Sequence, residues 1–278
     1  MPFNTFTFYI YKAVYTSYQL AKKYLAYYAT ASNAQGHGMH SPFVFQFIKK
    51  VLNNKDKMVP PSSIEALRKE LLSNKKDIQI KDLGAGSRLQ TNATRKISTL
   101  ARRAVKPKKY GQLLYRLAHY YQPKTIIELG TSLGITTAYL AAANEGAEVY
   151  TVEGSPSIHN LAVDNFNLLN FKNIDAIEGN FDTVLPRILE KQSRIDLAYV
   201  DGNHRLKPTL HYFELLLTKA HNDTIFVFDD IHWSAEMEEA WKSIKNNEAV
   251  TATIDLFFIG IVLLRNEFKT KQHFKVYF

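Results

Sequence analysis

Short apolar runs alternate with amphipathic stretches from Thr125 to the C-terminus. Near-continuous apolar runs are typical of strands that are buried on both faces of a parallel sheet, and the stretches between them have the spacing of helices. The pattern predicts strands at 125–129, 148–153, 174–179, 195–201 and 223–230. It predicts helices at 134–144, 156–169, 181–190, 206–220 and 234–246.

The last part of the chain has a different pattern. Two apolar runs within 250–265 are separated by Gly260 with no helix between them, so we expect an antiparallel hairpin to close the sheet. Together with the alternating strands and helices, this hairpin predicts a doubly wound, mostly parallel, seven-stranded α/β sheet.

The residues before Lys109 have helical patterns separated by loops. We expect a helix within 6–28, and a second one over 43–52 with Ser41 as its N-cap and Pro42 at its first position. A linker is predicted at 53–63 and a further helix at 64–72. After Lys109, a helix is predicted at 110–121. The segment DLGAGS at 82–87 imitates a phosphate-binding turn, but no second strand ending in an acid follows it. We therefore predict a loop before a basic helix.

Charge divides the chain in the same way. Residues 1–127 hold 22 lysine and arginine against 5 acidic residues, whereas residues 128–278 hold 13 against 21. A basic segment can bind an acidic partner such as nucleic acid, anionic lipid or a phosphorylated substrate, or it can dock on the acidic half of its own chain. Both explanations stay open. We divide the chain into a mainly helical, basic lid or substrate region, 1–108, and an α/β domain, 109–278.

Several classes of protein are excluded by composition. The chain has no cysteine, so neither disulfides nor thiolate chemistry contribute. It has no apolar run of about 18 residues that would form a transmembrane helix. The N-terminus lacks a basic n-region, and Lys12 interrupts its apolar stretch, so we expect no export signal and a cytoplasmic location.

The first strand-to-helix turn, in TIIELGTSLGITT, has the features of a nucleotide-binding site. Gly130 and Gly134 allow close approach of a ligand to the backbone, and Glu153 ends the next strand, where an acid can bind both hydroxyls of a ribose. A nicotinamide dinucleotide site is the first rival. It usually has a G-x-G-x-x-G pattern, whose second glycine is missing here. Glu128 would also repel a pyrophosphate and would suit a cationic ligand.

Acidic residues follow the fourth and fifth predicted strands, in YVDGNH and FVFDDIHW. Carboxyl ends of neighbouring strands face one crevice, so Asp201, Asp229 and Asp230 are expected to converge. Three carboxylates repel one another unless a cation holds them, and oxygen ligands suit Mg²⁺ or Ca²⁺. Each acid alone is as easily a helix cap or a solvated strand end. His232 and Trp233 are expected to line the same crevice.

From about Lys109 onward, KKYGQLLYRLAHYYQPKTIIELGTSLGITT and EGNFD at 178–182 carry a resemblance to a known family. This part of the chain resembles the class I S-adenosylmethionine-dependent methyltransferases. Within this class it is similar to the catechol O-methyltransferase-like group and the metal-dependent sugar O-methyltransferases of macrolide pathways. The resemblance implies a cofactor set of Glu128, Gly130, Thr131, Ser132, Gly134, Thr136, Glu153, Gly154, Gly179, Asn180, Phe181 and Asp201.

The resemblance also implies roles in catalysis. Catechol-type enzymes bind a divalent ion through an acid after strand four and two residues after strand five, which are Asp201, Asp229 and Asp230 here. Asp230 departs from the asparagine that is usual at its position. His204 lies where the catechol enzymes have a lysine base and the sugar enzymes a histidine, so we expect His204 to be the base and Asp201 to assist it.

The expected function is methyl transfer to a small hydroxylated acceptor. Two alternatives remain. One is a nucleic-acid methyltransferase that uses the basic half, although no asparagine-proline-proline-aromatic motif follows strand four. The other is a non-catalytic cofactor-binding module. Assembly into a homo-oligomer is left open.

Overall fold

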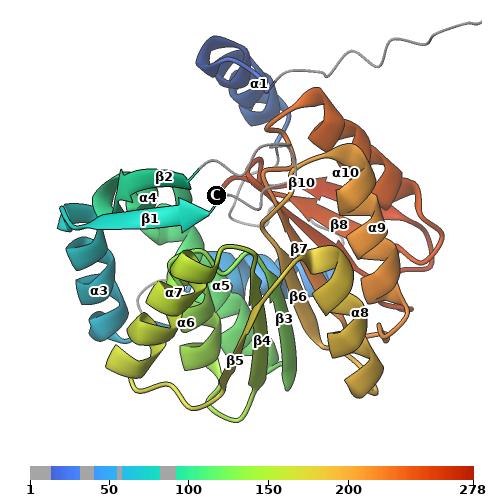
Figure 1. Cartoon of the computed structure of the whole chain (residues 1–278). Coiled ribbons are helices and arrows are strands. Elements are labelled where there is room, and N and C mark those ends of the chain that lie inside the picture. Colours follow the sequence, from blue (N-terminus) through green and yellow to red (C-terminus); the bar gives the residue numbers. More distant parts are fainter. Residues whose placement is uncertain (1–13, 32–40, 55–57, 82–91) are drawn as a thin grey trace, which may run out of the picture.

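An eight-stranded sheet forms the centre of the computed structural model, which describes residues 14–31, 41–54, 58–81 and 92–278 (Figure 1). Its strands are β3 (Thr125–Leu129), β4 (Glu148–Glu153), β5 (Ile174–Glu178), β6 (Leu197–Val200), β7 (Ile225–Asp229), β8 (Ala252–Asp255), β9 (Ile259–Leu263) and β10 (Gln272–Lys275). Their order is β10-β8-β9-β7-β6-β3-β4-β5, and β9 runs antiparallel to both of its neighbours. The doubly wound sheet and its closing hairpin are confirmed.

The predicted number of seven strands is wrong. β10 pairs in parallel with β8 at the edge of the sheet. Its four residues alternate between half-buried and exposed positions, as expected for an edge strand. A segment this short and polar does not stand out from a loop in the sequence.

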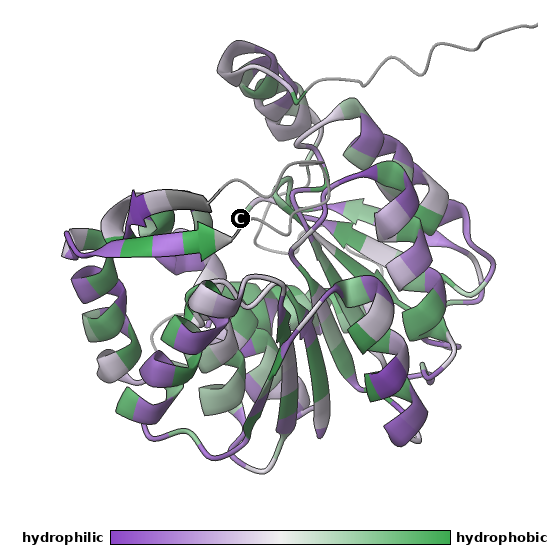
Figure 2. Cartoon of the chain, viewed as in Figure 1, coloured by the Kyte–Doolittle hydropathy of each residue, from purple (hydrophilic) through white to green (hydrophobic). Residues whose placement is uncertain are grey.

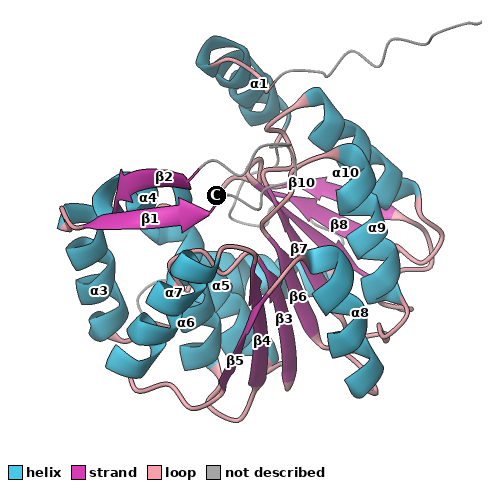
Figure 3. Ribbon diagram, viewed as in Figure 1, coloured by secondary structure: helices cyan, strands magenta, loops and turns pink. Residues whose placement is uncertain are grey.

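Helices cover both faces of the sheet (Figure 3). One face is covered by α5 (Lys108–Tyr121), α6 (Ile135–Ala143) and α7 (Pro156–Leu168), and the other by α8 (Phe181–Lys191), α9 (Leu206–Leu217) and α10 (Ala235–Asn246). Because successive strand residues point to opposite faces, Ile126 joins the first hydrophobic cluster and Ile127 the second. The strands are correspondingly apolar, and the helices are polar on their outer sides (Figure 2).

The N-terminal part is only partly helical. It contains α1 (Ser17–Thr30), α2 (Pro42–Phe47), the π-helical turn η1 (Ile48–Leu52), α3 (Ser62–Ser73), the strands β1 (Asp77–Lys81) and β2 (Asn92–Lys96), and α4 (Ile97–Ala104). Ser41 caps α2 by accepting a hydrogen bond from the Val44 N–H at 3.3 Å, and Pro42 occupies the first turn, as predicted. The 82–87 segment lies outside the described residues.

Two expectations for this part need correction. Residues 92–96 of the basic stretch form β2, which pairs antiparallel with β1, so the basic helix begins only at Ile97. The first helix begins at Ser17, where Thr16 forms a capping box with Gln19, and the predicted residues 6–13 lie outside the described chain. Elements α2 to α4 share one hydrophobic cluster with α5 and α6. The division of the chain at Lys109 stays a prediction.

Candidate active site

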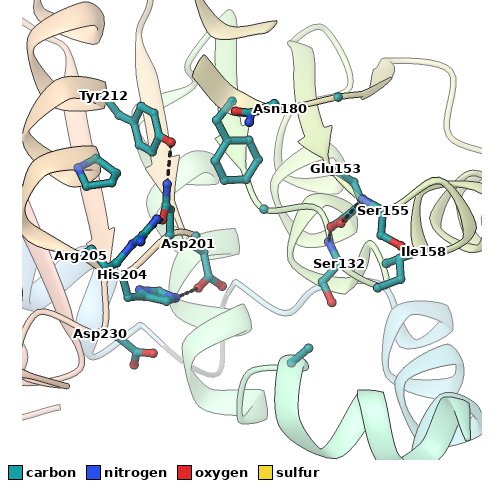
Figure 4. Close-up of a pocket in the computed structure, with 18 of the residues that line it drawn as sticks. Ser132, Glu153, Ser155, Ile158, Asn180, Asp201, His204, Arg205, Tyr212 and Asp230 are labelled. Carbon is teal, nitrogen blue, oxygen red and sulfur yellow. Dashed lines mark hydrogen bonds and ion pairs between the residues drawn. The ribbon is translucent and has the colours of Figure 1, made fainter. Parts of the chain in front are cut away.

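A cavity of about 530 Å³ opens at the carboxyl ends of the central strands (Figure 4). After β3 the chain adds β4 and β5 on one side and then returns to place β6 on the other. Ligands of doubly wound sheets bind at this kind of switch point. The residues that line the cavity are Ile80, Arg103, Ala104, Lys106, Gly130, Ser132, Glu153, Gly154, Ser155, Ile158, Gly179, Asn180, Phe181, Asp182, Asp201, Gly202, Asn203, His204, Arg205, Pro208, Tyr212 and Asp230.

The turn after β3 depends on its two glycines. Gly130 has a φ of 110°, and a Cβ built on it would lie 2.1 Å from the backbone oxygen of Asp201. Gly134 has a φ of 77°, and its Cβ would lie 2.5 Å from the ring of Phe166 on α7. Both glycines therefore allow segments of the protein to approach each other, and only Gly130 lines the cavity.

Glu153 is fixed at the end of β4 by backbone donors. Its Oε2 accepts a hydrogen bond from the Ser132 N–H and its Oε1 one from the Ser155 N–H, both at 2.9 Å. Burial raises the pKa of Glu153, and these backbone hydrogen bonds oppose the rise. A carboxylate has about four lone-pair sites, so the backbone donors leave part of its accepting capacity for a ligand. Figure 4 shows Glu153, Ser132 and Ser155 together on one wall of the cavity.

A second part of the wall follows β5. Gly179, Asn180 and Phe181 line the cavity as expected, and Ile158 of α7 joins them. Asn180 also caps α8, because its side-chain oxygen accepts a hydrogen bond from the Asp182 N–H at 2.8 Å. Ile158 was not predicted, since nothing in its sequence position separates it from other apolar residues of an amphipathic helix.

Four residues of the predicted cofactor set do not line the cavity: Glu128, Thr131, Gly134 and Thr136. Glu128 is fully buried beneath the turn, where its Oε2 accepts hydrogen bonds from the hydroxyls of Thr137 and Thr151. Its Oε1 has no partner among the described residues. Burial raises the pKa of Glu128 to about 8, so the side chain is mainly neutral at pH 7. Glu128 therefore lies beneath the turn and not on the cavity wall, and its role near a cationic ligand stays a prediction.

The raised pKa gives a testable dependence of stability on pH. Below pH 4.5 both folded and unfolded chains hold the Glu128 proton, whereas between pH 4.5 and 8 only the folded chain does. The free energy of unfolding should therefore fall by up to about 1.4 kcal/mol per pH unit in this range, relative to Glu128→Gln. Urea unfolding of both proteins at several pH values measures the difference. A constant difference would show that Glu128 has an ordinary pKa.

The three predicted acids converge, but on a group that the sequence did not indicate. The Lys106 ammonium forms an ion pair with Asp229 Oδ2. It also lies 3.7 Å from Asp201 Oδ1 and 3.8 Å from Asp230 Oδ2. Lys106 is one of several basic residues between α4 and the start of α5, and spacing alone does not distinguish it from them.

Whether a divalent ion fits this cluster depends on Lys106. Asp201, His204 and Asp229 each offer a ligand atom, and these atoms lie within 4.8 Å of one another. A cation bound by them would also meet the ammonium that is already paired with Asp229. Two like charges at this separation repel strongly in a partly buried site. As arranged, the residues hold the Lys106 ammonium, and a divalent ion would have to displace it.

His204 lies in the loop after β6, at the edge of the acid cluster. Its Nε2 is 3.5 Å from Asp201 Oδ1. The loop is held in place because Asn203 donates a hydrogen bond to the Tyr212 hydroxyl at 2.9 Å and accepts one from Arg205 at 2.8 Å. Figure 4 shows His204 directed toward Asp201. The two residues can therefore act as a base and its partner.

His232 and Trp233 are not among the residues that line the cavity, contrary to expectation. The ring of His232 lies between Asp255, with Nε2 at 2.9 Å, and Glu238, with Nδ1 at 3.2 Å. Glu238 also pairs with Lys23 of α1 at 2.9 Å. These contacts attach α1 to the α/β domain. The ion pairs of Lys23 and Lys106 join residues of the basic half to acids of the other half.

Comparisons with known proteins agree with this geometry. Residues 127–231 match a family model described as a methyltransferase domain. A catechol O-methyltransferase from Niastella koreensis is 27% identical over 124 residues, which are 44% of this chain and 55% of that relative. The match thus spans about half the length of the relative.

Solved structures share the fold. An O-methyltransferase from Bacillus cereus in complex with S-adenosylhomocysteine has a TM-score of 0.55 and 18% identity, over 80% of this chain and 97% of that one. A methyltransferase from Podospora anserina with S-adenosylhomocysteine bound has a TM-score of 0.58 and 12% identity, over 81% and 97%. The chain has the Rossmann-like fold of these proteins. Its resemblance to class I S-adenosylmethionine-dependent O-methyltransferases is confirmed.

Among the described residues, no helix has both the length and the apolar character needed to cross a bilayer.

Proposed function

We propose that this protein transfers a methyl group from S-adenosylmethionine to an oxygen of a small hydroxylated acceptor. The observation that carries the proposal is one cavity that joins the Glu153 turn to the His204–Asp201 pair. Its volume of about 530 Å³ is within the range of small-molecule sites. The catechol O-methyltransferase relative and the solved O-methyltransferases support the reaction type. They do not favour the nucleic-acid or non-catalytic alternatives.

The cofactor would lie along the parts of the cavity wall that follow β3, β4 and β5. Glu153 would accept hydrogen bonds from the ribose hydroxyls, and Phe181 and Ile158 would enclose the adenine. Gly130 and Ser132 would leave room for the methionyl part. Ile80, Arg103, Ala104 and Lys106 also line the cavity, which supports a lid or substrate role for residues 1–108.

The acceptor hydroxyl would lie between the methyl group and His204. With the Nε2–H of His204 directed to Asp201, Nδ1 is free to take the hydroxyl proton. S-adenosylmethionine, when bound, would supply the methyl group: an oxygen–carbon bond would form as the carbon–sulfur bond breaks, and the sulfur would keep the bonding electrons. The Asp201 carboxylate would then stabilise the imidazolium. Much of the rate would come from alignment of oxygen, carbon and sulfur. Assistance by Mg²⁺ or Ca²⁺ stays a prediction, and no step here depends on it.

Replacing Glu153 with alanine should weaken S-adenosylmethionine binding by roughly 1–3 kcal/mol, because the buried ribose hydroxyls lose their acceptor. Isothermal titration measures this loss. Glu178→Ala is the matched control, since Glu178 pairs with Glu153 in the strand register but is exposed and does not line the cavity. NAD should bind more weakly than S-adenosylmethionine. Tighter binding of NAD to the unmodified protein would contradict the cofactor assignment.

A further inference from the structure

Lys106 occupies the charge centre of the acid cluster. A cation is stabilised most by electrostatic attraction where it is close to all three carboxylates. The Lys106 ammonium lies within 3.8 Å of a carboxylate oxygen from each of Asp201, Asp229 and Asp230. Only 1% of the Asp229 side chain is exposed. Its Oδ2 pairs with Lys106, and its Oδ1 has no partner among the described residues. Burial of Asp229 as an anion therefore depends on Lys106.

The backbone holds Lys106 in this place. Lys106 precedes Pro107, and a residue before proline is restricted to extended conformations. Pro107 is the N-cap residue of α5, and the Lys106 carbonyl accepts a hydrogen bond from Arg68 of α3 at 3.4 Å. Its side chain is 19% exposed, whereas the neighbouring Arg103 and Lys108 are exposed residues. Lys106 is thus more buried than Arg103 and Lys108, although Arg103 also lines the cavity.

We propose that the Lys106 ammonium is the resident cation of the Asp201–Asp229–Asp230 cluster and takes the place of a divalent ion. An ammonium has three N–H donors, and only Asp229 lies within hydrogen-bond distance of Lys106, so an N–H of Lys106 can still donate to the acceptor oxygen. Methyl transfer then proceeds without added metal. The inference rests on the proposed function for its catalytic consequence, but competition between Lys106 and a metal ion can be measured without turnover.

Manganese binding provides that measurement. Mn²⁺ is titrated into metal-free protein and free Mn²⁺ is followed by electron paramagnetic resonance. Lys106→Met, which keeps the length of the side chain and removes its charge, should bind one Mn²⁺ at least about tenfold more tightly than the unmodified protein. Lys106→Arg, which keeps the charge, should resemble the unmodified protein. Adding Asp229→Asn to Lys106→Met should remove the gained binding.

The opposite results are equally clear. The proposal would be overturned if the unmodified protein bound Mn²⁺ as tightly as Lys106→Met does, or more tightly. If Lys106→Met does not fold, the unmodified protein still tests the proposal. Tight binding of one Mn²⁺ that is lost in Asp229→Asn would show that a metal ion binds beside Lys106, and the proposal would be wrong.

Turnover separates this proposal from the proposed function. With a hydroxylated acceptor, formation of S-adenosylhomocysteine should be the same in excess EDTA as in added Mg²⁺. A loss of more than about tenfold in EDTA that Mg²⁺ restores would refute the role of Lys106 while confirming methyl transfer. If no acceptor supports turnover, the proposed function loses its support, and the Mn²⁺ titration still decides what occupies the cluster.

Discussion

Replacing His204 with alanine should lower kcat by about 10²–10⁴-fold and leave the affinity for S-adenosylmethionine little changed. The acceptor hydroxyl must lose its proton as it attacks the methyl group, and His204 is the cavity-lining histidine that is directed toward Asp201, 3.5 Å away. Glu153 ends β4 and Phe181 begins α8, so the cofactor walls are formed by elements other than the loop that carries His204. Single-turnover kinetics measure the chemical step directly.

Two controls distinguish a base from a structural residue. Added imidazole should partly restore the rate of His204→Ala, because the truncated side chain leaves space beside Asp201 that imidazole can enter. His221→Ala should leave kcat unchanged, since His221 pairs with Asp196 and does not line the cavity. A His204→Ala protein with more than about a third of the original kcat would show that His204 is not the base.

The central fold was predictable because the strands at its centre, β3, β6 and β7, are mostly apolar along their whole length. The runs that became β3 and β7 are buried along nearly their whole length, which is the signature of a sheet covered on both faces. β10 could not be found in this way, because its residues alternate at an edge. The hairpin β1–β2 was missed for a related reason: the NATRK sequence of β2 has no apolar periodicity.

The acids of the site were predictable from topology alone. The carboxyl ends of the adjacent parallel strands β6 and β7 must lie side by side, so Asp201 and Asp229 must approach each other. The burial of Glu128 also follows from strand geometry, whereas the resemblance implied that Glu128 belongs to the cofactor set. Glu128 is two residues from Ile126, so both point to the face that α6 covers, where Thr137 binds Glu128.

The pairing of Lys106 with the acid cluster could not be predicted from the sequence. The acid-free segment between Leu83 and Ile127 is basic, and attraction between the two halves of the chain follows from charge. Which lysine reaches the cluster depends on the direction in which the chain leaves α4 and enters α5. That direction is set by tertiary contacts such as the hydrogen bond from Arg68 to the Lys106 carbonyl.

The ion pair between Lys106 and Asp229 should stabilise the folded protein far more than an exposed ion pair does. Lys106→Met leaves Asp229 buried without its cation, so the free energy of unfolding should fall by about 3–5 kcal/mol. Asp229→Asn should cost less, because Lys106 keeps Asp201 and Asp230 nearby. The double variant should recover most of the loss, because it removes both charges, with a coupling energy of more than about 1 kcal/mol.

Urea unfolding in EDTA measures these free energies, since EDTA prevents a metal ion from replacing the missing ammonium. Lys108→Met is the control for removing a positive charge from the same segment. Lys108 is exposed, and its substitution should change stability by no more than about 0.5 kcal/mol. If Lys106→Met costs no more than Lys108→Met, Asp229 does not depend on Lys106.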